Sequence, residues 1–463
     1  MADLPPSVAV TGMGLVLPTG TGLAAADAVF AGRSAVVHLN GTVDIAGATG
    51  APAAAFLPPE GTDAEDRAVQ MATAAADEAW RGARLDDLPL PADRVATLVS
   101  LSKGGIFALT RQAEGMAPRK KGTRGRRMSA PAARPRTSVP RRVLPRRDDR
   151  PRIARPDKTG RGTIQNIPPG YGDSLRFFAN LSADPAAAGR FLAGRYGLTG
   201  PVLTPVTACA SGGHALAWGA GLIRRGAADA ALVGAAEASL HPLVLGAYRR
   251  MGVLADAGGD PGTSVRPFSA TRRGFAVGEG AGVLVLESSA SAARRGVRPL
   301  AHLGGWATGA HHAGMTDVEA SGAALARLMR TALARAGTAP EAVDLVHAHG
   351  TATPANDLAE ARAVRAALGG AAEAVSVTST KGSHGHLLGA ATAVETVLTV
   401  LAVGRGLVPP TANLTDPDPA IGLDCTPLTA RRRPIRTAVK IAGGFGGQLV
   451  ALVLSQPQEG ARC

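Results

Sequence analysis

The sequence predicts an α/β fold in which sheets with parallel strands are covered by helices. From about residue 200 onward, short apolar runs of strand length alternate with longer runs of helical length, which favours parallel strands joined by helices. A similar set of runs lies on each side of a break near residues 254–274, which is compatible with an internally duplicated fold. The chain has 463 residues and is 45% hydrophobic but only 19% charged, so it can bury one or two large cores.

The expected elements are given in chain order. The first part contains a strand that ends in a glycine turn (7–14), a helix (64–84) and a short apolar strand (95–100). The later strands are expected at 202–207, 230–234, 282–287, 300–308, 345–349, 375–380, 438–442 and 449–455. The later helices are expected at 214–225, 320–336, 357–368 and 387–403. The most apolar of these helices, 387–403, carries Glu395 and is followed by Gly404-Arg405-Gly406, which predicts a buried core helix and no membrane span.

An Arg/Pro-rich segment at 117–165 interrupts this pattern. It shows neither the period of a strand nor that of a helix, and its composition cannot bury enough apolar surface to fold alone, so it is predicted to be a disordered insertion. Residues 119–161 contain 17 Lys or Arg against three Asp, which accounts for the whole net charge of +14. The excess charge therefore describes one segment, and no nucleic-acid partner is expected. A basic binding protein acting through residues 119–161 is kept as an alternative function.

The ends and cysteines of the chain indicate its compartment. Residues 1–6 lack the basic and apolar regions of a secretory signal. The three cysteines, Cys209, Cys425 and Cys463, form an odd count in a long chain, which suits a reducing environment. A cytoplasmic protein is expected.

Cys209 is the strongest candidate for a reactive group. It lies in Thr-Ala-Cys-Ala-Ser-Gly-Gly (207–213), between the strand expected at 202–207 and the helix expected at 214–225. The positive end of a helix dipole favours a thiolate, which is the nucleophilic form of Cys. A buried, inert thiol is the alternative interpretation of this segment, because free Cys is among the most buried residue types.

Two histidine motifs lie downstream of the Cys segment. They read His-Ala-His-Gly-Thr-Ala-Thr-Pro at 347–354 and Lys-Gly-Ser-His-Gly-His at 381–386. One Cys followed by two separate His motifs suggests acyl-transfer chemistry. The four histidines, His347, His349, His384 and His386, also permit a zinc site. Two explanations fit the glycine run at 443–447: a bulge between two strands, or a catalytic turn.

Together, these segments resemble the β-ketoacyl synthases, the decarboxylative condensing enzymes of fatty-acid and polyketide assembly. The family pattern is matched in order by residues 207–212, 348–357 and 379–391, and also by 8–14, 266–268 and 443–447. The resemblance covers most of residues 7–456. It implies a thiolase-like, duplicated, five-layer α-β-α-β-α fold. Residues 1–255 would form the half that carries the nucleophile, and residues 256–463 the half that carries both His motifs.

The resemblance also implies a reaction. An acyl group held on Cys209 would condense with malonyl-acyl-carrier protein, with loss of CO₂, to give a β-ketoacyl-carrier product. His349 and His386 would donate N–H groups to the enolate, and the backbone N–H groups of Cys209 and Phe445 would form the oxyanion hole. No metal and no cofactor is expected beyond the phosphopantetheine of the carrier.

Other matched positions would support these groups. Lys381 would have a structural and electrostatic role near Glu395, and Asp357 and Glu360 would belong to the surrounding polar network. Gly444 and Gly446, which flank Phe445, would let the backbone approach closely. His347 and His384 are expected to be structural or local, and a zinc site is not expected.

The chain departs from the family pattern at three places. The usual GFGGTN reads Gly-Phe-Gly-Gly-Gln-Leu at 444–449, the usual PFD-x-x-RDGF loses both acidic residues at 267–275, and His384 replaces a small polar residue. These departures favour a specialised polyketide-type synthase and leave room for lowered activity. The 117–165 insertion is explained either as a segment that attracts an acidic carrier protein or as a read-through or frame-shifted stretch.

Two kinds of partner are expected from the resemblance. One is an acyl-carrier protein. The other is a second ketosynthase-like subunit, in a homodimer or a heterodimer. A catalytically weak partner subunit like a chain-length factor is the alternative function, although such partners typically lack the Cys.

Overall fold

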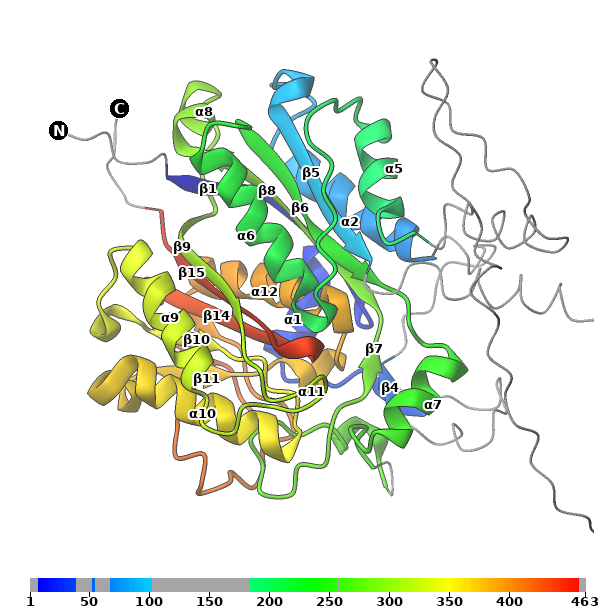
Figure 1. Cartoon of the computed structure of the whole chain (residues 1–463), viewed down its shortest axis with the longest axis vertical. Helices are drawn as coiled ribbons and strands as arrows, with labels where there is room; N and C mark the ends of the chain where they lie inside the picture. Colours follow the sequence, from blue (N-terminus) through cyan, green and yellow to red (C-terminus); the bar gives the residue numbers. More distant parts are fainter. Residues whose placement is uncertain (1–6, 39–51, 55–66, 102–183, 257–258, 458–463) are drawn as a thin grey trace, which may run out of the picture. The chain divides into compact units, whose positions relative to one another are not determined.

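The computed structural model describes residues 7–38, 52–54, 67–101, 184–256 and 259–457 (Figure 1). The chain divides into two units, residues 1–108 with 181–463 and residues 109–180. The second unit, the Arg/Pro-rich segment with its predicted disorder, and Cys463 all lie outside the described residues. All described residues belong to the first unit.

In sheet order, the first half of the central sheet contains β1 (Val8–Leu17), β8 (Gly280–Ser288), β6 (Ala230–Glu237) and β5 (Val95–Leu101), and the short strand β2 (Gly20–Thr21) also pairs with β1. β1 and β6 both pair with β8 in antiparallel fashion, whereas β5 runs parallel to β6. Beyond β5, Val202 forms a single parallel bridge with Thr97 at the edge of the sheet.

The second half repeats this arrangement. Its strands, in sheet order, are β9 (Ala301–Ala310), β15 (Gln448–Ser455), β14 (Thr437–Gly444), β10 (Leu345–His347) and β11 (Ser376–Thr378). The first two pairings are antiparallel and the last two are parallel, as in the first half. The halves join where β1 meets β9. The duplication implied by the family resemblance is therefore visible in the order and direction of the strands.

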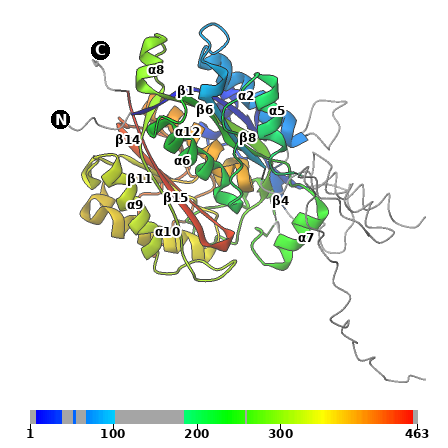
Figure 2. The ribbon, with the colours of Figure 1, turned by 45° about the horizontal axis from the view of Figure 1, so that its top comes forward.

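Helices lie on both outer faces and between the two halves of the sheet (Figures 1 and 2). Their bounds are α2 (Arg67–Gly82), α5 (Ala187–Arg195), α6 (Ser211–Arg224), α9 (Ala323–Arg335), α10 (Pro354–Leu368) and α12 (Ala391–Arg405). α2 and α5 pack on the first half, α9 and α10 cover the second, and α6 and α12 form the layer between them. This is the predicted five-layer arrangement.

Close packing of α6 and α12 brings the two halves together. A Cβ on Gly212 would lie only 2.7 Å from the Cβ of Ala393, so this crossing needs a residue without a side chain. Residues Leu388–Arg405 form a stretch long and apolar enough to cross a membrane by length and composition, but 89% of it is buried inside the fold. Its burial agrees with the predicted core helix.

Shorter elements complete the described part of the chain. They are β2 (Gly20–Thr21), α1 (Ala26–Phe30), β3 (Val36–His38), β4 (Pro52–Ala54), α7 (Pro242–Arg250), β7 (Val277–Gly278), α8 (Ser289–Arg294), α11 (Lys381–His384), β12 (Leu407–Val408) and β13 (Arg431–Arg432).

Several expected strands differ from the structure. The strand expected to end in a glycine turn at residue 14 continues through Gly14 to Leu17, and the strand expected at 375–380 ends at Thr378. The strand expected at 202–207 is only the bridge at Val202, because Pro201 and Pro205 have no backbone N–H to donate to a ladder. The strand expected at 345–349 ends at His347. His349 therefore lies two residues beyond the end of β10, outside the expected strand.

Candidate active site

Cys209 lies on a tight turn at the start of a long helix. The turn Ala208–Ala210 leads directly into the 14-residue helix α6, and Ala208 adopts a left-handed φ of 50°. The Ser211 hydroxyl accepts a hydrogen bond from Thr207 N (2.9 Å) and donates one to Ala208 O (2.7 Å). From the other half of the fold, the Thr392 hydroxyl donates to Cys209 O (3.0 Å). The turn is thus fixed from both sides, with Cys209 in the positive field of the helix N-terminus.

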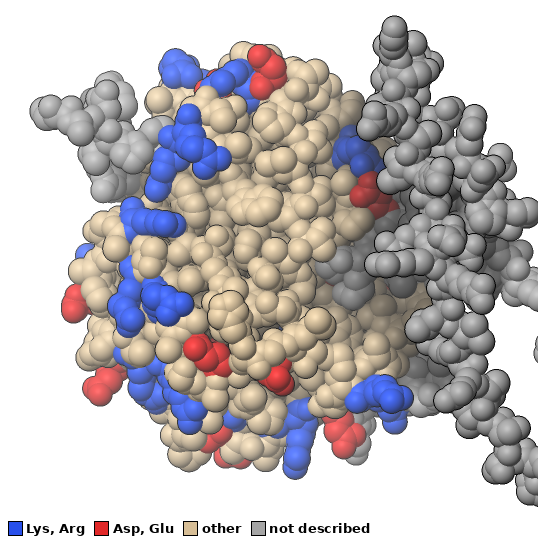
Figure 3. Space-filling view, viewed as in Figure 1, with Lys and Arg blue, Asp and Glu red and all other residues tan. Residues whose placement is uncertain are grey.

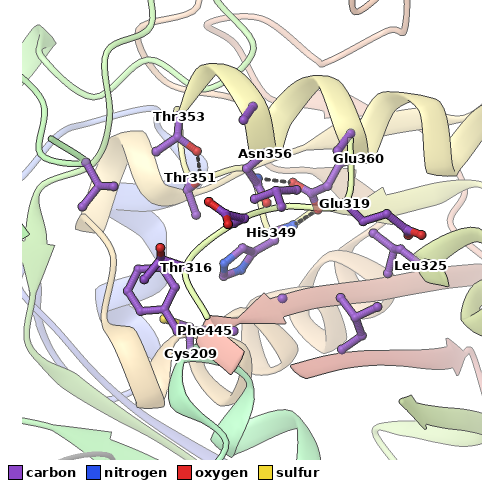
Figure 4. A pocket seen from close by; sticks show the side chains of 18 of the residues that line it. Cys209, Thr316, Glu319, Leu325, His349, Thr351, Thr353, Asn356, Glu360 and Phe445 are labelled. Atoms are coloured by element: carbon purple, nitrogen blue, oxygen red, sulfur yellow. Dashed lines mark hydrogen bonds between the residues drawn. The ribbon is translucent and has the colours of Figure 1, made fainter. Parts of the chain in front are cut away.

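A cavity of about 260 Å³ contains Cys209 together with His349, His386 and Phe445. The two imidazole rings lie 5.2 Å apart and nearly perpendicular to each other. Figure 4 shows His349 on the side of the cavity that faces Cys209 and Phe445. Other lining residues include Tyr248, Phe275, His311, Thr316, Asp317, Val318, Glu319, Leu325 and Asn356. Glu360 and Gly444 line it too, so the fold brings six of the site residues predicted from sequence to one cavity.

The turn at Phe445 lies directly against the Cys209 turn. Residues Phe445–Gly447 connect the paired strands β14 and β15, so the glycine run is a strand connection as well as part of the site. A Cβ on Gly444 would lie 2.7 Å from Thr207 O and 3.1 Å from Cys209 N. Gly446 has a φ of 78° and donates its N–H to Met315 O (2.7 Å). A side chain at position 444 would collide with the Cys209 turn, and the left-handed φ at position 446 favours glycine.

Glu360 holds the backbone around His349. Its two carboxylate oxygens accept hydrogen bonds from His349 N and Gly350 N, each at 2.6 Å (Figure 4). Burial, and then the neighbouring Asp357, raise the pKa of Glu360 to about 7. The sequence predicted this network role for Glu360, and the contacts are those of a residue that fixes a loop.

Asp357 has a similar position one turn earlier on α10. It accepts a hydrogen bond from Phe268 N (2.9 Å) and lies 3.8 Å from Arg272. Burial raises the pKa of Asp357 to about 6. Arg272 also contacts Asp418 at 2.6 Å, so the departure from the family pattern near Phe268 still has an ordered ion pair.

Lys381 and Glu395 form a fully buried ion pair below the cavity, and Lys381 Nζ also donates to His349 O. Neither residue lines the cavity. Glu395 also contacts Lys440 on β14, at 2.7 Å. Although burial opposes ionisation, the two lysines hold the pKa of Glu395 well below its ordinary value.

His347 and His384 have different surroundings. Both rings are fully buried and contact the Thr380 hydroxyl, at 3.1 Å and 2.8 Å, and His347 also contacts the Thr399 hydroxyl at 2.9 Å. In the part of the chain that the structure describes, no group of three or more His, Cys, Asp or Glu is placed to hold a metal ion.

Sequence reasoning missed several residues. The cavity wall at 316–319 and the side chain of Tyr248 carried no motif, and Phe275 ends the motif at 267–275 but was given no role. Lys440 was missed as well, although it stands alone in the apolar run 438–442, where a charged side chain needs a buried partner. A single lysine in an apolar run was the sequence signal that could have identified Lys440 as a paired, buried charge.

Comparisons with known proteins agree with this geometry. Residues 169–292 match the family "Beta-ketoacyl synthase, N-terminal domain", and residues 300–415 match "Beta-ketoacyl synthase, C-terminal domain". A putative polyketide beta-ketoacyl synthase 1 of Streptomyces cyaneus is 32% identical over 97% of this chain and 98% of its own length. Two further Streptomyces polyketide beta-ketoacyl synthases are 36% identical, but the chain spans only 61% and 63% of their length.

Solved structures show the same fold. One is a type II polyketide synthase acyl-carrier protein in complex with its ketosynthase bound to the hexaketide. It matches with a TM-score of 0.78 and 30% identity, over 98% of this chain and 100% of that chain. The ishigamide ketosynthase/chain length factor matches with a TM-score of 0.76 and 27% identity over the same shares.

The fold is that of the thiolase-like ketosynthases. Within that class, the chain belongs to the β-ketoacyl synthase family.

Proposed function

We propose that this protein catalyses the decarboxylative Claisen condensation of an acyl group with malonyl-acyl-carrier protein in polyketide biosynthesis. One observation carries the proposal: a Cys at a helix N-terminus shares one cavity with two neighbouring imidazoles and a glycine-flanked turn. A nucleophile, donors for an enolate and donors for an oxyanion are the three parts that this reaction needs.

In the first step, the Cys209 thiolate attacks an acyl thioester on the carrier. The acyl group passes to sulfur through a tetrahedral oxyanion, the carrier C–S bond breaks, and the carrier leaves as a thiolate. The backbone N–H groups of Cys209 and Phe445 would stabilise that oxyanion. The close approach allowed by Gly444 supports this arrangement, because it sets the Phe445 turn against Cys209 N.

In the second step, malonyl-carrier loses CO₂ and the electron pair of the broken C–C bond forms a thioester enolate. Neutral imidazole N–H groups on His349 and His386 would donate to the enolate oxygen. Burial, and then Lys381, lower the pKa of His349 well below its ordinary value, so it is neutral near pH 7. The enolate carbon then attacks the acyl-Cys carbonyl, which gives the β-ketoacyl-carrier and frees the Cys209 thiolate.

The remaining site assignments follow from these steps. Lys381, Glu395, Asp357 and Glu360 would support the loop that carries His349. The substrates would arrive on the phosphopantetheine arm of an acyl-carrier protein, and no other cofactor enters the proposal. A cytoplasmic location fits Cys209 and Cys425, which form no disulfide within the described residues.

The direct test supplies acyl-carrier and malonyl-carrier and measures the carrier by intact mass spectrometry. We expect the β-ketoacyl-carrier product, with release of one CO₂ per product. A folded protein that binds a related subunit but forms neither acyl-enzyme nor product would instead support the chain-length-factor-like alternative. The solved ketosynthase/chain length factor is a relative of that kind.

An apolar surface supports the expected second subunit. Val202, Leu203 and Val206 on the edge segment are 37–51% exposed, and Trp218 on α6 is 44% exposed. Figure 3 shows a broad area without charged residues over α6. An exposed sheet edge beside apolar side chains is typical of an interface that a partner covers. We propose that a second ketosynthase-like subunit packs here.

Trp218→Glu is expected to break this assembly. Buried Trp residues often contribute about 2 kcal/mol or more to an interface, which is about 30-fold in the dissociation constant. Sedimentation of the wild type should give a dimer, and the variant should give monomer at the same concentration. Leu300→Glu is the matched control, because Leu300 is 39% exposed just before β9. A Trp218→Glu variant that stays dimeric would contradict the assignment of this face.

A further inference from the structure

Lys440 is a second buried lysine that the proposed reaction does not use. Its side chain is 0% exposed and comes from the middle of β14, directly opposite His347 in the parallel pairing with β10. A fully buried lysine is rare, because an ammonium group loses its hydration inside a protein. Such a group persists where it is paired, so its partners indicate what it does.

Lys440 has two hydrogen-bond acceptors and one ion-pair partner. Nζ donates to His347 O (3.2 Å) and Ala348 O (2.9 Å), and it lies 2.7 Å from Glu395 Oε2. Both acceptors are carbonyls of the segment that leads into His349.

Together, Lys440, Lys381 and Glu360 fix the whole turn. Lys440 binds the carbonyls of residues 347 and 348, Lys381 binds the carbonyl of His349, and Glu360 binds the N–H groups of residues 349 and 350. The strand ends at His347, so the ladder of β10 does not extend to His349. Hydrogen bonds from charged side chains replace the ladder beyond His347. These bonds set the position at which the His349 ring enters the cavity.

Glu395 is shared by two lysines, and this has an electrostatic consequence. Lys381 contacts Oε1 and Lys440 contacts Oε2, and all three side chains are fully buried. With both lysines protonated, the trio carries one net positive charge directly below the cavity. A buried positive charge disfavours the imidazolium form of a neighbouring His and favours the development of enolate charge.

Other titratable groups also contribute to the electrostatic environment of His349. The titratable and charged residues around it are His347 on β10, Lys381 and His384 on α11, His386 just after it, Glu395 on α12, Asp357 and Glu360 on α10, Lys440 on β14, and Cys209, Tyr248, His311, Asp317 and Glu319 in the cavity lining. The negative charge of Glu395 offsets the positive charge of one lysine, and the second lysine supplies the net positive charge of the trio.

We propose that Lys440 is a positioning residue for the condensation, which fixes the turn before His349 and supplies the net positive charge that keeps the His349 ring neutral. The catalytic part of this inference rests on the proposed function, whereas the effect on His349 does not. Lys440 lies outside the cavity lining, so it acts through His349 and the enolate rather than by substrate contact. Burial and then Lys381 lower the pKa of His349, Glu395 opposes them, and Lys440 adds a smaller lowering, which agrees with this role.

The first test measures His349 itself, without substrate. Ring nitrogens of ¹⁵N-histidine-labelled, full-length protein are titrated by NMR, with the His349 signal assigned by its loss in His349→Gln. In Lys440→Met the trio has no net charge, and the protonation midpoint of His349 should rise by about one pH unit. In the double variant Glu395→Gln/Lys440→Met the charge of +1 is restored, and the midpoint should return toward the wild-type value.

Thermal unfolding of each variant is measured before the titration. Lys440→Met leaves Glu395 with one buried partner fewer, whereas the double variant removes the Lys440–Glu395 pair but leaves Lys381 without its carboxylate. If Lys440→Met does not fold, the double variant, whose trio carries +1, is compared with Glu395→Gln, whose trio carries +2. These two variants also differ by the charge of Lys440, so the difference between their His349 midpoints measures the same effect. Arg295→Met is the matched control, because it removes the partner of the fully buried Glu287 far from His349 in the fold.

The second test measures malonyl-carrier decarboxylation against pH in a Cys209→Ala background, which removes the titration of the thiol. The acid limb should move to higher pH in Lys440→Met, with kcat reduced and KM unchanged. Burial lowers the pKa of Lys440 to about 8, so the wild-type rate should also fall above pH 8, and Lys440→Met should lack that limb. An unchanged His349 midpoint in folded Lys440→Met, or an equal shift in Arg295→Met or in the double variant, would overturn the proposal.

Absence of any decarboxylation would have a different meaning. If the wild type does not decarboxylate malonyl-carrier while the His349 midpoint still follows the charge of the trio, the proposed function fails and the role of Lys440 in holding His349 neutral stands.

Discussion

Cys209→Ala is expected to abolish formation of the acyl-enzyme and, with it, all condensation. The reaction needs a covalent acyl group close to the enolate, and the thiolate at the start of α6 lies in the cavity with both imidazoles. The measurement is intact-protein mass spectrometry after incubation with an acyl-carrier thioester. The wild type should gain one acyl mass and the variant none.

The fold of Cys209→Ala should remain intact. The side chain is small and 7% exposed, so its loss leaves little empty volume, and the turn is held by Ser211 and Thr392. A thermal unfolding curve close to that of the wild type would show this. Acylation that persists in the variant, or that maps to another cysteine, would show that the nucleophile has been misassigned.

Cys425→Ala is the matched control for that experiment. Cys425 is also a free, buried cysteine, but it packs in the apolar core under α10. Burial, followed by Asp357 and Asp424, raises the pKa of its thiol, so it is protonated at neutral pH. This variant should acylate as the wild type does.

Much of the fold could be predicted because the α/β pattern is local. Apolar strands such as β6 and helices such as α9 carry their period in the sequence, and the structure places them within a few residues of the expected bounds. The ends were less accurate where tertiary contacts decide them. The strand β10 stops at His347 because side chains of Lys440 and Glu360 take over the backbone bonds that a ladder would make.

The motif residues of the site were predictable, but their supporting contacts were not. Cys209, His349, His386 and Phe445 each lie in a short recognisable pattern, and the fold brings these distant patterns to one cavity. A sequence pattern does not show which buried charged side chains contact each other. The sharing of Glu395 by two lysines is visible only in the packing of β14 against α12.

His349→Ala and His386→Ala are each expected to lower the rate of malonyl-carrier decarboxylation by about 10²–10³. Each variant removes one N–H donor from the enolate oxygen, and the single ring that remains cannot occupy both donor positions. The measurement is single-turnover release of CO₂, normalised to folded enzyme. Acylation of Cys209 should be affected less, because it depends on the oxyanion donors and the helix field rather than on the enolate donors.

His347→Ala and His384→Ala separate this role from a general effect of losing a buried imidazole. Both rings are fully buried and bonded to Thr380, so these variants should lose stability while their folded fraction keeps most of its decarboxylation rate. Burial lowers the pKa of His384 to about 4, so it is neutral at pH 7, as His349 is, and still has no place in the cavity lining. Equal rate losses in all four variants, accompanied by zinc bound to the purified protein, would favour a metal site over two enolate donors. A large loss confined to His349 and His386 would identify proximity to Cys209, rather than neutrality or burial alone, as what gives an imidazole its part in the reaction.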